Sequence, residues 1–255
     1  MSEKLRCVHP HIEKTGGTSR KALFEQMFSP REIMAYNPMT NTFIRASDLK
    51  SNRYPILFEI KQKLKQTFLR PLINHFVLQL DRQSGEKDID WSKLTDLDWR
   101  VLTGHFELTA DKLQQLPTSY RTVVVREPVE RLFSQYRKKK KEYGTPRFRE
   151  MIPFDPNLSF FEFAKLPSLQ NYQARTLGGL DLTEFDLVGT TAQLDRYSAR
   201  LLADFGFNPQ LYQIGHKNGG SGPKKPPITA EQRAVLKKVH AHDYELYHQA
   251  MHLAR

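Results

Sequence analysis

Cysteine is almost absent from this sequence, with Cys7 as the only one among 255 residues. A single cysteine excludes a disulfide framework and a cysteine-based metal cluster, and it suits a reducing compartment. Long apolar runs are missing too, because no segment reaches the ~18 apolar residues of a membrane span. Glu3, Lys4 and Arg6 precede the first apolar stretch, which is unlike a secretory signal. We therefore expect a soluble, cytoplasmic protein without a membrane anchor.

Acidic residues are in deficit, because 39 Lys and Arg residues outnumber 28 Asp and Glu residues and give a formal net charge of +11. This excess predicts an anionic partner, and nucleotides, nucleic acids and acidic polysaccharides all qualify. The chain is long enough for one well-cored domain, and no break in composition marks a second. We expect a single domain over residues 1–255, with a variable helical insertion at about 30–98. Within that insertion, apolar residues recur at every fourth position from Ile56 to Leu80.

A glycine-bearing turn lies between a predicted strand and a predicted helix near the N-terminus. Residues 5–12 are mostly apolar and predict the strand, and Leu23 and Met27 recur at helical spacing after the turn. The turn consists of Lys14, Thr15, Gly16, Gly17, Thr18 and Ser19, with Thr18 or Ser19 in place for the helix N-cap. Glycines, converging N–H groups and hydroxyl groups here suit a phosphate group. A plain glycine turn with a helix cap explains the segment equally well, and the lysine precedes the glycines, unlike the P-loop consensus.

Further strands are predicted from three runs of apolar and β-branched residues, at 99–103, 122–125 and 185–189. A helix is expected after the last of them, at 194–205, whereas the pattern over 30–52 is irregular. Strands that alternate with helices predict an α/β fold, in which helices flank both faces of a central parallel sheet. Ligands of such sheets bind at the carboxyl ends of the strands.

A second strand-to-helix junction carries Arg126 and Ser134. Arg126 follows the β-branched run 122–125, and Pro128 suits the first position of the next helix. Arg126 can bind a phosphate through two hydrogen bonds, and Ser134 can donate its hydroxyl to the same group. Taken alone, a surface ion pair with Glu127 explains this segment better, because such pairs are common.

Together, the two junctions resemble the signature elements of the sulfotransferase superfamily. Residues 11–19 read H-I-E-K-T-G-G-T-S, and eight of nine positions match the family's 5′-phosphosulfate loop, H-I-P-K-T-G-G-T-S. Residues 125–136 are similar to the family's 3′-phosphate element, V-R-D-P-V-E-R-L-x-S-x-Y. The likeness is to the carbohydrate branch, which includes the heparan sulfate 2-O-sulfotransferases. Glu13 departs from it, because the family usually has proline there. Other segments that look like family landmarks are 171–175, 186–191 and 243–247.

The resemblance implies a P-loop-like three-layer fold and an enzyme with 3′-phosphoadenosine 5′-phosphosulfate (PAPS) as donor and 3′-phosphoadenosine 5′-phosphate (PAP) as product. It implies a saccharide or polysaccharide acceptor, acidic ones included, and no nucleic-acid partner is expected. A metal ion is not expected either, because the lower charge of sulfate removes the need for one and no histidine or carboxylate cluster has a metal-ligand spacing. Lys14 would bind the phosphosulfate and neutralise the leaving oxygen. The donor-binding residues that it implies are Lys14, Thr15, Gly16, Gly17, Thr18, Ser19, Arg126, Ser134 and Lys217. Lys217 belongs to a basic loop at 217–227, which a solvated linker explains equally well.

His105 is the expected general base. It follows Gly104 at the end of a predicted strand, and imidazole titrates near neutral pH. The pair is similar to the Gly-His pair of heparan sulfate 2-O-sulfotransferases, whose histidine acts as base. The alternative is a histidine that only hydrogen-bonds a neighbouring loop, with Glu107 and His11 as reserve bases. His9 and His11 would share one face of a strand, but without further ligands they do not predict a zinc site.

Two other functions stay open. A P-loop-like kinase would need a G-K-[ST] lysine and a strand-borne aspartate for magnesium, and neither is evident. A non-catalytic nucleic-acid-binding module would account for the positive charge, but no helix-turn-helix, RNA-recognition or zinc-finger signature accompanies it. The basic run 137–141 can guide a polyanion, although cations at a helix C-terminus are the simpler interpretation.

Overall fold

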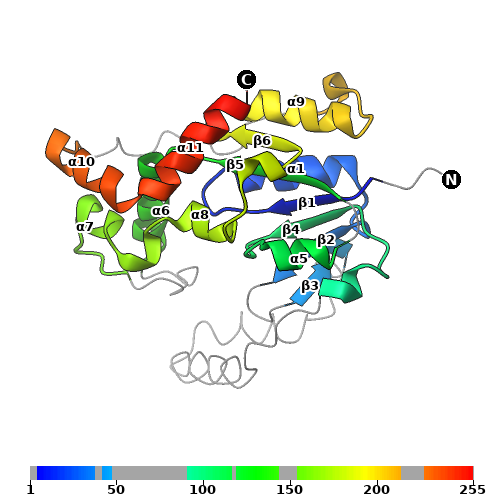
Figure 1. Cartoon of the computed structure of the whole chain (residues 1–255), viewed down its shortest axis with the longest axis horizontal. Coiled ribbons are helices and arrows are strands. Elements are labelled where there is room, and N and C mark those ends of the chain that lie inside the picture. The colour runs from blue at the N-terminus through cyan, green and yellow to red at the C-terminus, as the bar shows by residue number, and fades with distance from the viewer. Residues whose placement is uncertain are drawn as a thin grey trace, which may run out of the picture.

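The computed structural model describes residues 5–37, 42–47, 91–116, 119–143, 154–213 and 227–254. They form an α/β fold around a six-stranded sheet with the strand order β3-β2-β4-β1-β5-β6 (Figure 1). The strands are β1 (Cys7–Pro10), β2 (Ile33–Asn37), β3 (Thr42–Arg45), β4 (Val101–Gly104), β5 (Tyr120–Val125) and β6 (Leu187–Thr190). All neighbouring strands are parallel except β2 and β3, so that the expected central parallel sheet is confirmed.

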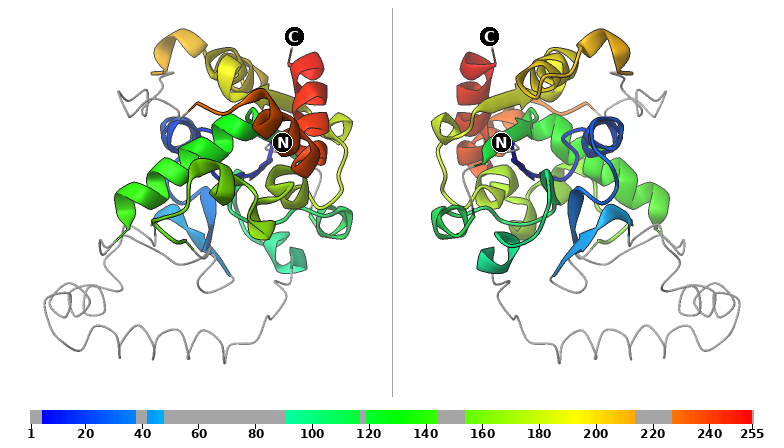
Figure 2. Two further views of the ribbon diagram at one scale, coloured as in Figure 1. Left: turned by 90° about the vertical axis from the view of Figure 1, so that its left-hand side faces the viewer. Right: turned by 90° about the vertical axis from the view of Figure 1, so that its right-hand side faces the viewer.

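Helices lie on both faces of this sheet. The described helices are α1 (Gly17–Met27), α5 (Ala110–Gln114), α6 (Pro128–Glu142), α7 (Phe160–Ala164), α8 (Tyr172–Thr176), α9 (Leu194–Asp204), α10 (Ala230–Val239) and α11 (Ala241–Leu253). Figure 2 shows α1 and α11 on opposite sides of the sheet. Side chains of α1 and α9 form one buried cluster, and those of α5, α8 and α11 contribute to another. A third cluster joins α6, α7 and α10.

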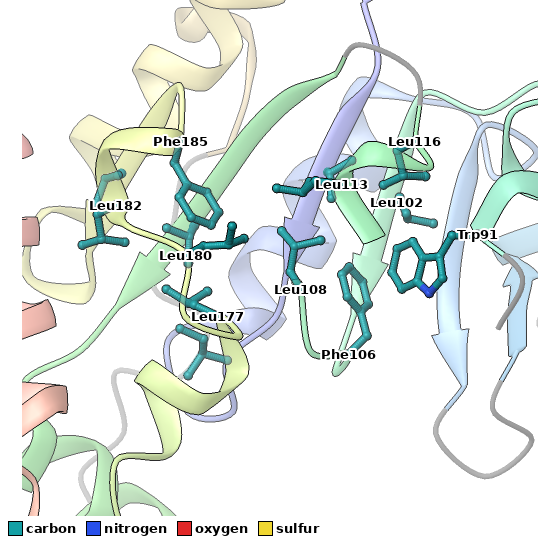
Figure 3. Close-up of a cluster of buried hydrophobic side chains, with 14 of the residues drawn as sticks. Trp91, Leu102, Phe106, Leu108, Leu113, Leu116, Leu177, Leu180, Leu182 and Phe185 are labelled. Carbon is teal, nitrogen blue, oxygen red and sulfur yellow. The ribbon is translucent and has the colours of Figure 1, made fainter. Parts of the chain in front are cut away.

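The interior strands are continuous apolar runs because both of their faces are buried. In β5, Val123 and Val125 belong to the cluster on the α5 face, whereas Val124 belongs to the cluster on the α1 face. Leu108, Leu113 and the leucines that follow α8 fill the first of these clusters (Figure 3). Burying one aliphatic side chain of this size stabilises a fold by about 1.5–3 kcal/mol. These layers hold the strand ends in fixed positions.

The predicted strands at residues 5–12, 99–103, 122–125 and 185–189 correspond to β1, β4, β5 and β6, and Pro128 is the first residue of α6. The region 30–52 was expected to be irregular, and this is wrong, because it contains β2 and β3. β2 pairs with the distant strand β4, a pairing that no local pattern marks, and β3 pairs antiparallel with β2. Both strands fall within the range assigned to the helical insertion.

The expected N-cap of α1 is also wrong. The helix begins at Gly17 with Gly16 as its N-cap, so that Thr18 and Ser19 lie inside the first turn. The periodic segment Ile56–Leu80 and the basic loop at 217–226 lie outside the described residues. Among the residues that the structure describes, no helix is long and apolar enough to cross a membrane.

Candidate active site

Three neighbouring strand ends carry the predicted site residues. β4, β1 and β5 are adjacent and parallel, so that His105, Lys14 and Arg126 all follow carboxyl ends at the same edge of the sheet. The chain leaves β1 toward α1 on one face and leaves β4 toward α5 on the other. Such a divergence of adjacent strands is the switch point at which parallel sheets bind ligands. The sequence-predicted residues are therefore brought together where a crevice is expected.

A buried arginine supports the loop after β1. Arg20, only 2% exposed, donates through Nη1 to the carbonyl oxygen of Thr15 and through Nη2 to Thr15 Oγ1. His9 Nε2 accepts a hydrogen bond of 2.7 Å from Arg20 Nε, and His9 Nδ1 donates to the Thr122 carbonyl. Burial and the charge of Arg20 lower the pKa of His9, so that this histidine is neutral. The loop is thus supported by the buried side chains of Arg20 and His9.

The first turn of α1 follows this loop directly, and the N–H groups of Gly17 and Thr18 precede the hydrogen bond from the Ser19 N–H to the Gly16 carbonyl. Gly16 has a φ of 86°, which favours glycine, and within the described residues no side chain caps this helix. The first N–H groups of an uncapped helix have no intrahelical acceptor and attract anions. Gly17 is required for a different reason, because a Cβ there would lie 1.7 Å from His11 Nε2. The imidazole of His11 therefore packs directly on the backbone where the helix starts.

His105 is held by the same loop. Its Nδ1 lies 2.7 Å from the carbonyl oxygen of His11, and its ring stacks on the His11 ring at 4.2 Å. Because a carbonyl only accepts, Nδ1 carries the proton, and Nε2 of the neutral ring is left as a proton acceptor. His105 is exposed as a residue, but desolvation by the surrounding protein lowers the pKa of its imidazole, an effect that Glu13 opposes. His105 therefore has the tautomer and protonation state of a general base at neutral pH.

Gly104 allows His105 to leave the strand in this direction. Its φ is 150°, and a Cβ at this position would lie 2.5 Å from Cβ of Tyr36 on the neighbouring strand β2. Any other residue would push β2 away from β4. The glycine before the histidine thus has a steric basis that the sequence alone does not reveal.

Arg126 spans the gap between β5 and the loop after β1. Its Nη1 donates to the carbonyl oxygen of Lys14 at 3.3 Å, and its side chain is 29% exposed and within reach of a ligand. Gln173 of α8 holds its backbone, because Oε1 accepts from the Arg126 N–H at 2.9 Å and Nε2 donates to the Arg126 carbonyl at 2.8 Å. Gln173 is fully buried, so this clamp is shielded from water. The sequence marks Gln173 only as part of a family landmark.

The electrostatics of the site favour an anion. Burial and the positive charge of Lys138 lower the pKa of Lys14, with Arg126 acting in the same direction and Glu13 against it. Like charges that depress one another's pKa are stabilised when an anion binds between them. Lys138 was not predicted as a site residue. Its side chain lies on α6, 3.4 Å from Glu13 Oε1.

The remaining predicted donor-binding residues differ in what they can offer. Thr15 is buried and its hydroxyl donates to the Ile12 carbonyl at 2.8 Å, so that it shapes the loop rather than pointing outward. Thr18 is exposed and Ser19 half-buried in the first turn of α1. Ser134 is half-buried on α6, two turns after Arg126. Lys217 lies outside the described residues.

His11 and Glu107, the two alternative bases, are placed less well than His105 to accept a proton. Burial, together with the neighbouring His105, strongly lowers the pKa of His11, and its ring is wedged between Gly17 and His105. Glu107 is exposed beside an open cavity of about 740 Å³ whose lining includes Asn171, Arg175 and His242. Within the described ranges, no group of three histidine, cysteine, aspartate or glutamate residues has the arrangement of a metal site.

Comparison with known proteins adds no assignment. No protein-family model matches the chain, and no curated protein matches it.

Proposed function

We propose that this protein is a sulfotransferase that transfers a sulfuryl group from PAPS to a hydroxyl group of a saccharide. The observation that carries the proposal is the convergence of three strand ends. Lys14 after β1 and Arg126 after β5 are joined by the 3.3 Å hydrogen bond between Arg126 Nη1 and the Lys14 carbonyl. His105 after β4 is joined to the same loop by its bond to the His11 carbonyl.

The strand order supports a P-loop-like fold as part of this proposal. The five parallel strands follow the order β2-β4-β1-β5-β6, with the loop-bearing strand β1 in the middle. The loop after a central strand, followed directly by a helix N-terminus, is the arrangement that binds phosphate groups. The lysine position still separates this loop from the NTPase consensus.

Two anionic groups of the donor have two separate partners. The 5′-phosphosulfate would lie against Lys14 and the open first turn of α1, where N–H groups and the helix dipole favour negative charge. The 3′-phosphate would lie against Arg126 and Ser134, which stand on the next junction along the sheet. Because the site is built from fixed strand ends, positioning and electrostatic stabilisation supply most of the rate.

The transfer step uses one base and one cation. Nε2 of His105 takes the proton of the acceptor hydroxyl as its oxygen forms a bond to sulfur. The bond between sulfur and the bridging oxygen of PAPS breaks, and its electron pair stays on the phosphate oxygen of PAP. Lys14 neutralises that developing charge, and the imidazolium later releases its proton to water.

Single-turnover transfer of radiolabelled sulfuryl from PAPS to a panel of saccharides, without added metal, tests the proposal. We expect His105→Ala to lower turnover by about 10²–10⁴-fold with donor affinity retained. Lys14→Ala should impair donor affinity and turnover together. His252→Ala is the matched control, because it removes an exposed imidazole from α11.

Transfer at the wild-type rate by folded His105→Ala would move the base to Glu107 or His11. Phosphoryl transfer from ATP in place of sulfuryl transfer from PAPS would contradict the proposed function itself.

A further inference from the structure

The loop after β1 contains a turn with an unusual occupant. The Thr15 N–H bonds to the Ile12 carbonyl at 3.4 Å, and Lys14, at the third position of this turn, has a φ of 72°. A left-handed third position is the pattern of a type II turn, in which proline suits the second position because its ring presets φ. Glu13 occupies that second position. It cannot stiffen the turn through its own backbone, while the left-handed Lys14 adds strain.

The Glu13 side chain is bonded to helix α6 instead. Gln135 Nε2 donates to Glu13 Oε2 at 3.1 Å, and Lys138 Nζ lies 3.4 Å from Glu13 Oε1. Gln135 Oε1 in turn accepts from Arg131 Nη1 at 2.9 Å, and Arg131 lies over the Tyr172 ring at 4.8 Å. Both Gln135 and Arg131 are fully buried. A chain of polar contacts therefore runs from the interior of α6 to this turn.

We propose that Glu13 is a positioning residue that clamps the turn to α6 and so fixes both Lys14 and the His11 carbonyl that orients His105. The two side-chain contacts replace the stiffness that a proline would give the turn. The catalytic meaning of these positions rests on the proposed function, but the clamp itself can be observed without it.

The clamp brings charge close to His105 as well as to Lys14. The His11 ring stacks on His105, and the charged groups that act on its pKa are Glu13 from the loop, Lys138 from α6 and Arg20 from α1. Glu13 raises the pKa of His105, and Lys138 lowers it. The two members of one ion pair thus act on the imidazole with opposite signs, as charges held at fixed positions near it must.

Titration of the histidines by NMR at 25 °C tests the clamp without substrate, with His105→Ala used to assign the resonance. We expect Glu13→Gln to lower the pKa of His105 and Lys138→Gln to raise it. Glu25→Gln is the matched control, because it removes one negative charge from the exposed side of α1 and should leave the pKa of His105 in place. An unchanged pKa in Glu13→Gln, or a shift of the same sign in both variants, overturns the proposal.

Turnover separates positioning from charge. We expect Glu13→Ala to lower single-turnover transfer by about 10–10²-fold, the size of effect seen when reacting groups are misplaced by about 1 Å. Glu13→Pro should restore most of this rate, since proline stiffens the turn, while the pKa of His105 stays low for lack of the carboxylate. If the wild type transfers sulfuryl and Glu13→Ala does so at the same rate, the proposed role of Glu13 is wrong but the proposed function stands. Failure of the wild type to bind PAP would remove the proposed function, whereas the NMR result would still decide the clamp.

Discussion

The two strand-to-helix junctions of the site differ in how the N–H groups at the start of the helix are capped. At the β1–α1 junction, Gly16 is the N-cap, and no described side chain or acidic residue of the first turn satisfies the helix N–H groups. At the β5–α6 junction, Glu127 accepts from the Glu130 N–H at 2.6 Å and Pro128 occupies the first position. The second helix start is therefore closed. An anion can meet backbone N–H groups at the first junction, whereas at the second the Glu130 N–H is already bonded to a carboxylate and Arg126 offers a cationic side chain.

The supports of the junctions differ as well. The β1–α1 loop is held from within by Arg20 and His9, which lie on the junction's own helix and strand, in addition to the contacts of Glu13 with α6. Arg126 is held from outside by Gln173 of α8. The first junction offers backbone N–H groups, so the conformation of its whole loop must be fixed. The second offers the side chain of Arg126, so only the backbone of that residue must be fixed.

Gly17→Ala is expected to break the first junction with the largest effect. A Cβ at 1.7 Å from His11 Nε2 would force the His11 ring away and take the His105 stack with it. We expect single-turnover transfer to fall by about 10²-fold or more, since a small misplacement of reacting groups has this cost. Gly206→Ala is the control, because a Cβ there meets no atom within 4 Å, and its φ of 76° makes the comparison stricter by adding a backbone strain that Gly17 does not have. Equal activity of the two variants would mean that the close approach at Gly17 is irrelevant.

Arg126→Ala tests the second junction. Loss of a charged hydrogen bond to a phosphate should weaken PAP binding by about 1.5–3 kcal/mol, measured by calorimetry. Glu127→Ala is the matched control at the next residue. It removes a helix cap at a cost of about 0.5–2 kcal/mol in the free energy of unfolding, and should not weaken PAP binding. An unchanged dissociation constant for folded Arg126→Ala would show that this junction does not bind the nucleotide.

Much of the two junctions could be predicted from sequence, because a β-branched run, a glycine pair and a proline at a helix start are local signals. The supports could not. Arg20 to His9, Gln173 to Arg126 and Lys138 to Glu13 join residues 11, 47 and 125 positions apart. No periodicity links such pairs, since only the tertiary fold brings them together. The pairing of β2 with the distant strand β4 is likewise not marked by any local pattern, whereas the β-branched run of β5 is a local signal.

Lowering the pH is expected to reduce the free energy of unfolding through the two buried histidines of the first junction, His9 and His11. Burial lowers the pKa of His9 and of His11 below the value of about 6.5 for a free imidazole. Above pH 6.5 both are neutral in the folded and unfolded states, and the stability is complete. As the pH falls below this value, His9 and His11 become protonated in the unfolded chain but stay neutral in the folded protein.

The free energy of unfolding should therefore fall by about 1.4 kcal/mol per pH unit for each such histidine. Denaturant unfolding at pH 7, 6 and 5 measures the slope, and His9→Gln should flatten it. A stability that is constant over this range would contradict the neutral, buried state of His9.

Calorimetry of PAP and ATP binding to the wild-type protein, without magnesium, tests the central claim most directly. PAP carries the 3′-phosphate that Arg126 and Ser134 are proposed to bind, and ATP lacks it. We predict that PAP binds far more tightly than ATP and needs no metal. Equal affinities for the two nucleotides, or binding of ATP that depends on magnesium, would contradict the assignment of the two junctions to the two ends of PAPS.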